Sequence, residues 1–202
     1  MKEHYYEKLL NIKTMGEQKE FSDFMHYHPY ESTPYDGLEV LFDQYEVKRS
    51  DRIVDFGCGK GRVNFYIHYF YQATVVGIEV NPYYYQEAIK NRYRYLEKYS
   101  KSMDTIFFHN CKAESYQINA EDNRFYFFNP FSVQIFIKII HNILQSFEKF
   151  PRAIEVILYY SSEDYMYFLE NQTAFELKQE IIVPQLYKDN PYEKFLIYQL
   201  TD

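Results

Sequence analysis

Short apolar runs alternate with longer segments of helical periodicity along most of this chain. Runs rich in β-branched and aromatic residues predict strands at 52–56, 74–79, 105–109, 124–128 and 153–160. The segments between these runs repeat apolar residues at i, i+3, i+4 and i+7, which is typical of helices with one buried face. Strand–helix units repeated in this way predict a parallel sheet with right-handed crossovers and helices on both faces.

The last part of the chain departs from this alternation. Residues 175–183 and 195–200 are again predicted as strands, but the polar connection at 184–193 is too short for a helical crossover. Two strands joined without a helix must be antiparallel. The whole pattern therefore predicts an α/β fold. We expect a three-layer αβα sandwich with a seven-stranded, mostly parallel sheet and an antiparallel C-terminal hairpin strand.

Helix starts are marked by capping residues. Thr33 is predicted as the N-cap of a helix that begins at Pro34, and Asp36 completes a pattern like a capping box. Asn81-Pro82 predicts the start of a helix that runs to about residue 99, and Ser132 is predicted to cap the helix after the fourth strand. The spacing predicts three buried helix faces, made of Val63, Ile67 and Phe70, of Tyr85, Ile89 and Leu96, and of Phe136, Ile139, Ile140, Ile143 and Phe147.

Length and composition limit the domain organisation and the location. The 202 residues suit one α/β domain, and no Pro/Gly/Ser-rich linker divides them. We expect residues 1–202 to form a single domain, with a helical cap segment at 1–50 and the core at 51–202. No apolar stretch is long enough to span a membrane, the N-terminus is charged, and the chain has two distant cysteines. These features favour the cytoplasm and no membrane partner.

Charge and aromatic content say less about function. The net charge of -7 argues against a broad nucleic-acid surface, although a local basic groove stays open. The 24 Tyr and 18 Phe could form stacking platforms, but packing in strands and helix faces explains them more simply. The basic and aromatic residues at 90–98 have the same two interpretations, a nucleic-acid groove or the solvated face of a helix, and we favour the second.

A glycine loop after the first strand points to a cofactor site. Residues 52–56 run directly into Gly57-Cys58-Gly59-Lys60-Gly61, and a helix is predicted to follow. Backbone N–H groups and the helix dipole bind ligands at such turns. The dinucleotide pattern G-x-G-x-x-G would need glycine where Arg62 stands. Asp55 would also repel a pyrophosphate, whereas it would attract a cofactor with a cationic centre.

The stretch from Asp55 to Gly61 resembles the E/D-x-G-x-G-x-G motif of the class I, Rossmann-like S-adenosylmethionine-dependent methyltransferases. The resemblance extends over residues 33–200, since the family's sheet has seven strands with the last one inserted antiparallel. It implies S-adenosylmethionine as cofactor. It also implies a ribose contact from Glu79 at the end of the second strand and an adenine contact from Val80. The loop residues that the resemblance assigns to the cofactor are Asp55, Phe56, Gly57, Cys58, Gly59 and Gly61.

The loop after the third strand matches the family less closely. Many members carry an acidic residue there that contacts the adenine amino group, and this chain has Lys112, Ala113 and Glu114 in that region. The adenine contact is left to a main-chain group, to Glu114 or to Asn110. These three loop residues, Lys112 to Glu114, are therefore candidate cofactor contacts.

Residues at the end of the fourth strand are candidates for the methyl acceptor. Asn129-Pro130-Phe131 resembles a shortened [N/D]-P-P-[Y/F] motif of the amino methyltransferases. The resemblance implies that Asn129 and the Pro130 carbonyl accept hydrogen bonds from a target amine, that Phe131 stacks on the acceptor, and that Asn129 also lies beside the cofactor. The alternative is that Asn129-Pro130 only ends the strand.

The aromatic segment before the first strand is the second candidate for acceptor contacts. Tyr30, Thr33 and Tyr35 could fold over the cofactor, together with Tyr27 and His28. The histidines form no convincing metal cluster, and we expect no metal site. The predicted function is methyl transfer to an unidentified acceptor, which could be an amine-bearing small molecule, a protein or a nucleic acid. Alternatives are a catalytically silent S-adenosylmethionine-binding protein and, less favoured, an NAD-dependent oxidoreductase.

Overall fold

A single seven-stranded sheet forms the centre of the molecule. The computed structural model describes residues 2–16, 31–99 and 105–200. The strand order is β3-β2-β1-β4-β5-β7-β6. β1 to β5 are mutually parallel, whereas β7 is antiparallel to both β5 and β6. The strands are β1 (Arg52–Phe56), β2 (Thr74–Glu79), β3 (Ile106–Asn110), β4 (Arg124–Phe128), β5 (Ile154–Tyr159), β6 (Glu176–Ile182) and β7 (Lys194–Leu200).

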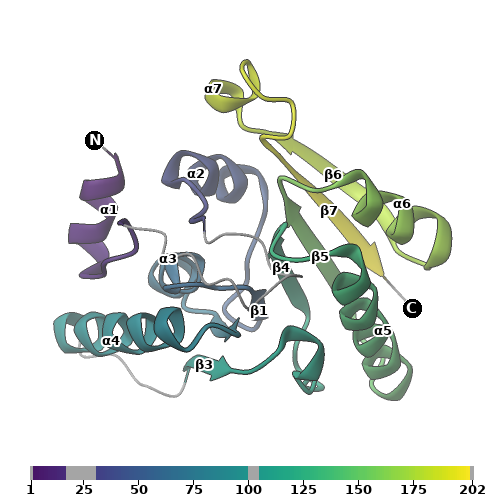
Figure 1. Cartoon of the computed structure of the whole chain (residues 1–202), viewed down its shortest axis with the longest axis horizontal. Coiled ribbons are helices and arrows are strands. Elements are labelled where there is room, and N and C mark those ends of the chain that lie inside the picture. The colour runs from purple at the N-terminus through teal and green to yellow at the C-terminus, as the bar shows by residue number, and fades with distance from the viewer. Residues whose placement is uncertain (1, 17–30, 100–104, 201–202) are drawn as a thin grey trace.

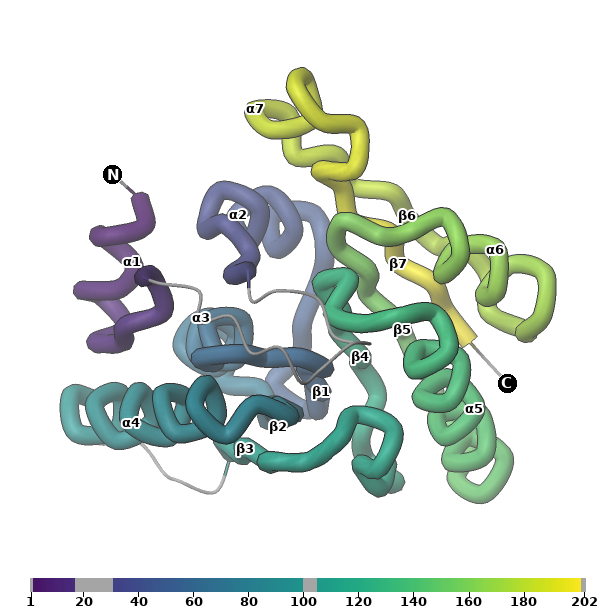
Figure 2. The backbone as a smooth tube through the Cα atoms, in the orientation of Figure 1, coloured from purple at the N-terminus to yellow at the C-terminus, as the bar shows by residue number. Residues whose placement is uncertain are grey.

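Helices cover both faces of this sheet (Figure 1). One face is covered by α2 (Tyr35–Gln44), α3 (Arg62–Tyr71) and α4 (Pro82–Tyr99), and α1 (Lys2–Leu10) packs on α2 and α3. The other face packs on α5 (Val133–Lys149), α6 (Glu163–Gln172) and the 3-10 turn η2 (Ala113–Ser115). The connection between β6 and β7 holds the short helix α7 (Pro184–Tyr187) and projects at one end of the molecule (Figure 2). The predicted three-layer fold with its antiparallel hairpin is confirmed.

Side chains alternate between two separate cores. In β1, Val54 and Phe56 belong to the core under α5 and α6, whereas Ile53 belongs to the core under α1 to α4. The same alternation turns Asp55 toward the α1–α4 side. Many core aromatics are tyrosines whose hydroxyls are satisfied internally, as when Tyr165 donates to the Phe131 carbonyl oxygen at 2.5 Å. The tyrosine-rich composition therefore serves packing to a large extent.

Some details of the helices differ from the sequence predictions. The first residue of α2 is Tyr35, its N-cap is Pro34, and no side chain caps this end. Thr33 is therefore not the N-cap, because its hydroxyl instead hydrogen-bonds the Tyr126 hydroxyl at 2.8 Å. Phe70 is exposed on α3. In α4, Leu96 is buried as predicted, whereas Tyr85 and Ile89 are half-buried and the buried positions are one residue earlier, at Tyr84 and Ala88. A helix covered on two sides has a wider buried arc than its spacing indicates.

Strand bounds are close to the predictions. β1, β2 and β4 have the predicted residues. β3 begins one residue later than expected because residue 105 belongs to a 3-10 turn, and it ends one residue later at Asn110. β5 is one residue shorter than predicted at each end. Among the described residues, no helix is both long and apolar enough to cross a membrane.

Gly77 in β2 has no side chain, which lets Phe108 and the loop residue Cys58 pack directly on this strand. A Cβ atom at Gly77 would lie 2.5 Å from Cδ1 of Phe108 and 2.7 Å from Sγ of Cys58. We expect Gly77→Ala to lower the free energy of unfolding by about 1–3 kcal/mol, because both neighbours must move. Urea denaturation measures this change. Gly37→Ala in α2 is the control, since its Cβ would meet only the Phe195 ring and the Tyr159 hydroxyl, at 3.7 Å or more. Equal stability of the two variants would contradict the prediction.

Candidate cofactor site

The candidate site lies where the parallel strands end. β1 and β4 are neighbours, and the chain continues to β2 on one side of them and to β5 on the other. This reversal of strand order is the place where open α/β sheets bind ligands. The glycine loop, the turn after β2, the loop after β3 and the residues after β4 all leave the sheet at this edge.

Backbone hydrogen bonds fix the glycine loop to the end of β2. The amides of Gly57 and Cys58 both donate to the Ile78 carbonyl oxygen, at 2.9 and 3.1 Å. Gly57 has φ of +80°, and a Cβ there would lie 2.6 Å from Cβ of Pro130. Gly61, the N-cap of α3, has φ of +86°. The chain therefore needs glycine both for the left-handed backbone and for the close approach of the loop to the residue after β4.

Glu79 connects the loop to the turn after β2. Its Oε2 accepts from the Gly59 amide at 2.9 Å, and its Oε1 accepts from the Asn81 amide at 2.7 Å. Burial raises the pKa of Glu79 to about 7, while these amides and that of Val80 act in the opposite direction. Each carboxylate oxygen keeps a second acceptor position, which suits a pair of ligand hydroxyls.

Asp55 is a second buried carboxyl beside this loop. It is only 3% exposed, and within the described part of the chain no donor hydrogen-bonds to it. Burial, followed by the nearby Glu79 carboxyl, raises its pKa well above the ordinary value. Two neighbouring acidic groups disfavour a pyrophosphate and favour a cationic ligand. Burial also raises the pKa of Cys58, so this loop thiol stays protonated.

The loop after β3 completes the edge beside β2. The Asn110 side-chain amide donates to the backbone oxygens of Glu79 and Val80, at 2.8 and 3.0 Å. Asn110 therefore fixes the turn that carries the predicted ribose and adenine contacts. Lys112 is exposed, Ala113 is buried and Glu114 is half-buried. The structure brings these loop residues to the edge where the glycine loop lies, as the sequence predicts.

The three residues after β4 have different environments. Asn129 has φ of +37°, in the left-handed region, and Pro130 lies against Gly57. Phe131 is fully buried in the core, with its ring edge-to-face on Phe127. Phe131 therefore cannot serve as the predicted stacking surface for an acceptor, because its ring fills the space under α5. Asn129 and Pro130 remain at the candidate site.

The N-terminal residues that were predicted to contact the methyl acceptor also have different environments. Tyr30, Tyr27 and His28 lie outside the described residues. Tyr35 is fully buried and stacks on Tyr6 with ring centroids 4.6 Å apart, so its role is packing and not acceptor binding. Thr33 is buried as well. Its hydroxyl hydrogen-bonds that of Tyr126, which is paired with Asp55 in the register of β1 and β4. Thr33 therefore lies beside the sheet edge that carries the glycine loop, called here the cofactor edge.

Arg62 holds the N-terminal segment on the core, a role that the sequence did not reveal. Its guanidinium forms an ion pair with Glu3 at 2.6 Å and donates to the Thr14 hydroxyl at 2.7 Å and the Thr33 carbonyl at 3.1 Å. It also lies over the Tyr35 ring, 4.5 Å from the centroid. These partners are 27 to 59 residues away in sequence, so no local spacing could have indicated them.

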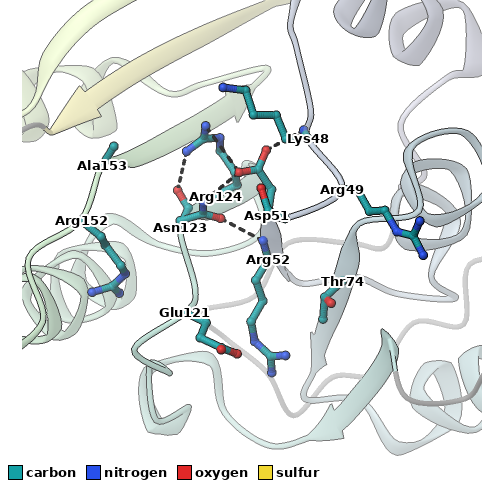
Figure 3. Close-up of a pocket in the computed structure, with 11 residues that line it drawn as sticks. Lys48, Arg49, Asp51, Arg52, Thr74, Glu121, Asn123, Arg124, Arg152 and Ala153 are labelled. Atoms are coloured by element: carbon teal, nitrogen blue, oxygen red, sulfur yellow. Dashed lines mark hydrogen bonds and ion pairs between the residues drawn. The ribbon is translucent and has the colours of Figure 1, made fainter.

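A basic pocket lies at the opposite edge of the sheet, where the strands begin (Figure 3). It has a volume of about 570 Å³ and is lined by Lys48, Arg49, Arg52, Arg124 and Arg152 among others. Three of these cations hold strand ends together. Arg52 pairs with Asp122 at 2.7 Å, Arg124 pairs with Glu155 at 3.3 Å, and Arg152 donates to the Asp122 carbonyl at 2.7 Å. The arginines of this pocket therefore stabilise the starts of the strands, at the edge opposite the glycine loop.

Metal binding has no comparable support. Within residues 2–16, 31–99 and 105–200, no three His, Cys, Asp or Glu side chains are grouped to hold a metal ion. His109, near the end of β3, is largely exposed; partial desolvation of its ring, followed by the nearby Arg52, lowers its pKa. His68, in contrast, bonds to the hydroxyls of Tyr95 and Thr105, at 2.8 and 2.9 Å.

No protein-family model matches the chain, and no curated protein matches its sequence. Solved structures with similar folds do exist. An RNA methyltransferase from Salinibacter ruber in complex with S-adenosyl-L-homocysteine matches 86% of this chain and 95% of its own, with a TM-score of 0.58 at 16% identity. M. capricolum TrmK in complex with S-adenosyl-homocysteine matches 84% of this chain and 68% of its own, with a TM-score of 0.57 at 14% identity.

An S-adenosylmethionine dependent methyltransferase from Mesorhizobium loti matches 82% of this chain and 98% of its own, with a TM-score of 0.54 at 9% identity. At such identities the likeness concerns the fold. That fold is the one that the glycine motif and the C-terminal hairpin predict. The chain has the Rossmann-like fold of the class I S-adenosylmethionine-dependent methyltransferases.

Proposed function

We propose that the protein is an S-adenosylmethionine-dependent methyltransferase that consists of one domain, with residues 1–50 as a helical cap on the core 51–202. The observation that carries the proposal is the pair of buried acidic side chains at the glycine loop. Glu79 accepts from the Gly59 and Asn81 amides and keeps acceptor positions for two ribose hydroxyls. Asp55, which has no donor among the described residues, suits the ammonium group of the methionine part.

S-adenosylmethionine supplies a methyl group on a positively charged sulfur. The chain's own residues have to bind this cofactor and align an acceptor with it, because alignment provides most of the rate in such a transfer. Glycine at 57, 59 and 61 lets the backbone approach the ligand, and Val80 and residues 112–114 lie where the adenine would bind. Asn129, at the end of β4, is the proposed acceptor for hydrogen bonds from a target amine.

The acceptor class is a finer proposal. The similar protein from Salinibacter ruber is an RNA methyltransferase, which favours a nucleobase as acceptor over a protein or a small amine. The net charge of -7 fits recognition of a base better than recognition of a long phosphate backbone. We further propose that the protein acts in the cytoplasm.

Calorimetry tests the cofactor. We expect S-adenosylmethionine and S-adenosylhomocysteine to bind the wild-type protein, and NAD to give no heat of binding. Binding of NAD without the other two ligands would overturn the proposal in favour of an oxidoreductase. A labelled-methyl transfer assay over RNA, protein and small-molecule fractions then separates an enzyme from a silent binding protein, which would bind the cofactor and label no fraction.

Asn129→Gly tests the proposed acceptor contact. Glycine suits the φ of +37°, so we expect the free energy of unfolding to stay the same or rise by up to about 1 kcal/mol. Methyl transfer should fall at least about tenfold, since a hydrogen bond to the acceptor is lost. Urea denaturation and the labelled-methyl assay measure the two effects. Undiminished transfer would show that Asn129 only ends the strand.

A further inference from the structure

Two strained strand ends lie side by side at the candidate site. Asn129 and Tyr160 follow directly after β4 and β5, and both have positive φ, +37° and +54°. Phe128 and Tyr159 pair in the register of these two strands, so the strained residues are neighbours. The other described non-glycine residues with positive φ, Asn11 and Gln72, follow helices, where this conformation is common. For a bulky residue such as Tyr160 it is costly and often marks function.

Aromatic rings gather around these strand ends. We call Phe128, Tyr159, Tyr160 and Tyr192 the strand-end cluster. The ring centroids of Phe128 and Tyr159 are 4.7 Å apart, those of Phe128 and Tyr160 are 6.3 Å apart, and those of Tyr160 and Tyr192 are 5.5 Å apart. β4, β5 and the connection between β6 and β7 each contribute to the cluster, so three separate segments build one aromatic surface.

The cluster is partly open and its orientation is fixed. Tyr192 is 43% exposed, Phe128 and Tyr160 are half-buried, and Tyr159 is buried beneath them. The Asn190 side-chain amide donates to the Tyr160 hydroxyl at 2.8 Å, and the Tyr159 hydroxyl donates to Glu193. A rigid aromatic surface with an exposed face offers stacking area to a planar ligand at little entropic cost.

The cluster adjoins the cofactor loop. Phe128 is two residues before Pro130, and Pro130 is so close to the loop that a Cβ on Gly57 would lie 2.6 Å from it. A ligand stacked on the cluster would therefore lie next to Asn129 and at the edge where the glycine loop ends. Phe131, which the sequence suggested as the stacking ring, is buried. The strand-end cluster is therefore the candidate stacking surface in its stead.

We propose that the strand-end cluster stacks on the acceptor, and that this acceptor is a nucleobase. The inference rests on the proposed methyltransferase function. A base presents a flat π-face to Tyr160 and Tyr192 and an exocyclic amine to Asn129, which uses both features of the site. The cations of the basic pocket lie at the opposite edge of the sheet, so they take no part in this contact.

Binding experiments with defined probes test this assignment. The protein is saturated with S-adenosylhomocysteine, and two arms follow: a fluorescein-labelled, mixed-sequence single-stranded RNA of ten nucleotides, and the four free nucleosides. We expect binding in at least one arm. Tyr192→Ala should weaken it about tenfold, the size of one lost stacking contact. Tyr192→Phe should stay within about twofold of wild type, because the stacking face is retained.

The control is Tyr167→Ala, which removes a 62% exposed tyrosine on α6 and should leave binding unchanged. Equal loss in Tyr192→Ala and Tyr167→Ala, or no loss in either, overturns the inference. Absence of binding in both arms, by a protein that binds S-adenosylhomocysteine in calorimetry, overturns it too and leaves the cofactor proposal intact. Absence of S-adenosylhomocysteine binding overturns both proposals.

Discussion

Replacing Glu79 by alanine is expected to weaken binding of S-adenosylmethionine about 100-fold or more. Hydrogen bonds to a charged group contribute about 1.5–3 kcal/mol each, and two ribose hydroxyls would lose their acceptor together. The amides of Gly59 and Asn81 also lose their partner, which loosens the loop. Calorimetry measures the affinity. Glu176→Ala, on the exposed face of β6, is the matched control and should bind like wild type. Equal affinities for both variants would refute the ribose contact.

The same carboxyl links cofactor binding to pH. Burial raises the pKa of Glu79 to about 7 from its ordinary value of 4.5, and ligand hydroxyls donate best to the ionised form. Affinity should therefore rise as the pH increases through about 7, with release of protons. Calorimetry at pH 7 in buffers of different ionisation enthalpy detects this release, and Glu79→Gln should abolish the Glu79 contribution.

The stability of the free protein changes in the opposite direction. Because the folded-state pKa of Glu79 lies above its unfolded value, the folded state binds more protons between these values. The contribution of Glu79 to the free energy of unfolding is therefore most favourable below about pH 4.5, and it is lost as the pH rises through 7. The raised pKa of Asp55 acts in the same direction. A bound cationic cofactor should offset this loss at neutral pH.

Arg62→Met is expected to lower the free energy of unfolding by about 2–4 kcal/mol. The variant loses an ion pair with Glu3, two hydrogen bonds and the contact with the Tyr35 ring. The Glu3 side chain is 35% exposed, so water can hydrate its carboxylate when the ion pair is lost. We therefore expect a smaller loss of unfolding free energy than for a fully buried ion pair. Urea denaturation provides the measurement.

A second measurement distinguishes detachment of the cap from a general loss of stability. Limited proteolysis of Arg62→Met should cleave residues 2–16 earlier than the core, because Glu3 and Thr14 lose their shared partner. Arg62→Lys keeps the charge but not the planar group that reaches three partners, so it should give an intermediate result. A change in unfolding free energy below about 1 kcal/mol would show that Arg62 does not hold the cap.

The sequence predicts this fold well because its information is local. The bounds of β1, β2 and β4 follow from short apolar runs next to turn residues, and the hairpin follows from the length of one connection. The cofactor edge is predictable for the same reason, since the glycine loop and Glu79 each lie directly at a strand end. Contacts between distant segments could not be predicted, as Arg62 shows.

The acceptor side was predictable only in part. The motif at Asn129-Pro130-Phe131 identifies the right strand end, but burial of Phe131 depends on how α5 and α6 pack below the sheet. Tyr35 was expected to fold over the cofactor because of its position and aromatic character, whereas Tyr6 and Arg62 enclose it. Tyr160 and Tyr192 gave no signal in sequence, because 32 residues separate them.

The position of β7 has a consequence for biosynthesis. β7 lies between β5 and β6, although it is translated after both. At 5–20 residues per second, the 41 residues that follow Tyr159, up to Leu200, take about 2–8 s to be made. During this time the edge of β5 has no neighbour and can pair with other nascent chains. Completion of the sheet is therefore a late event, and the edge of β5 stays open to other chains until β7 has been made.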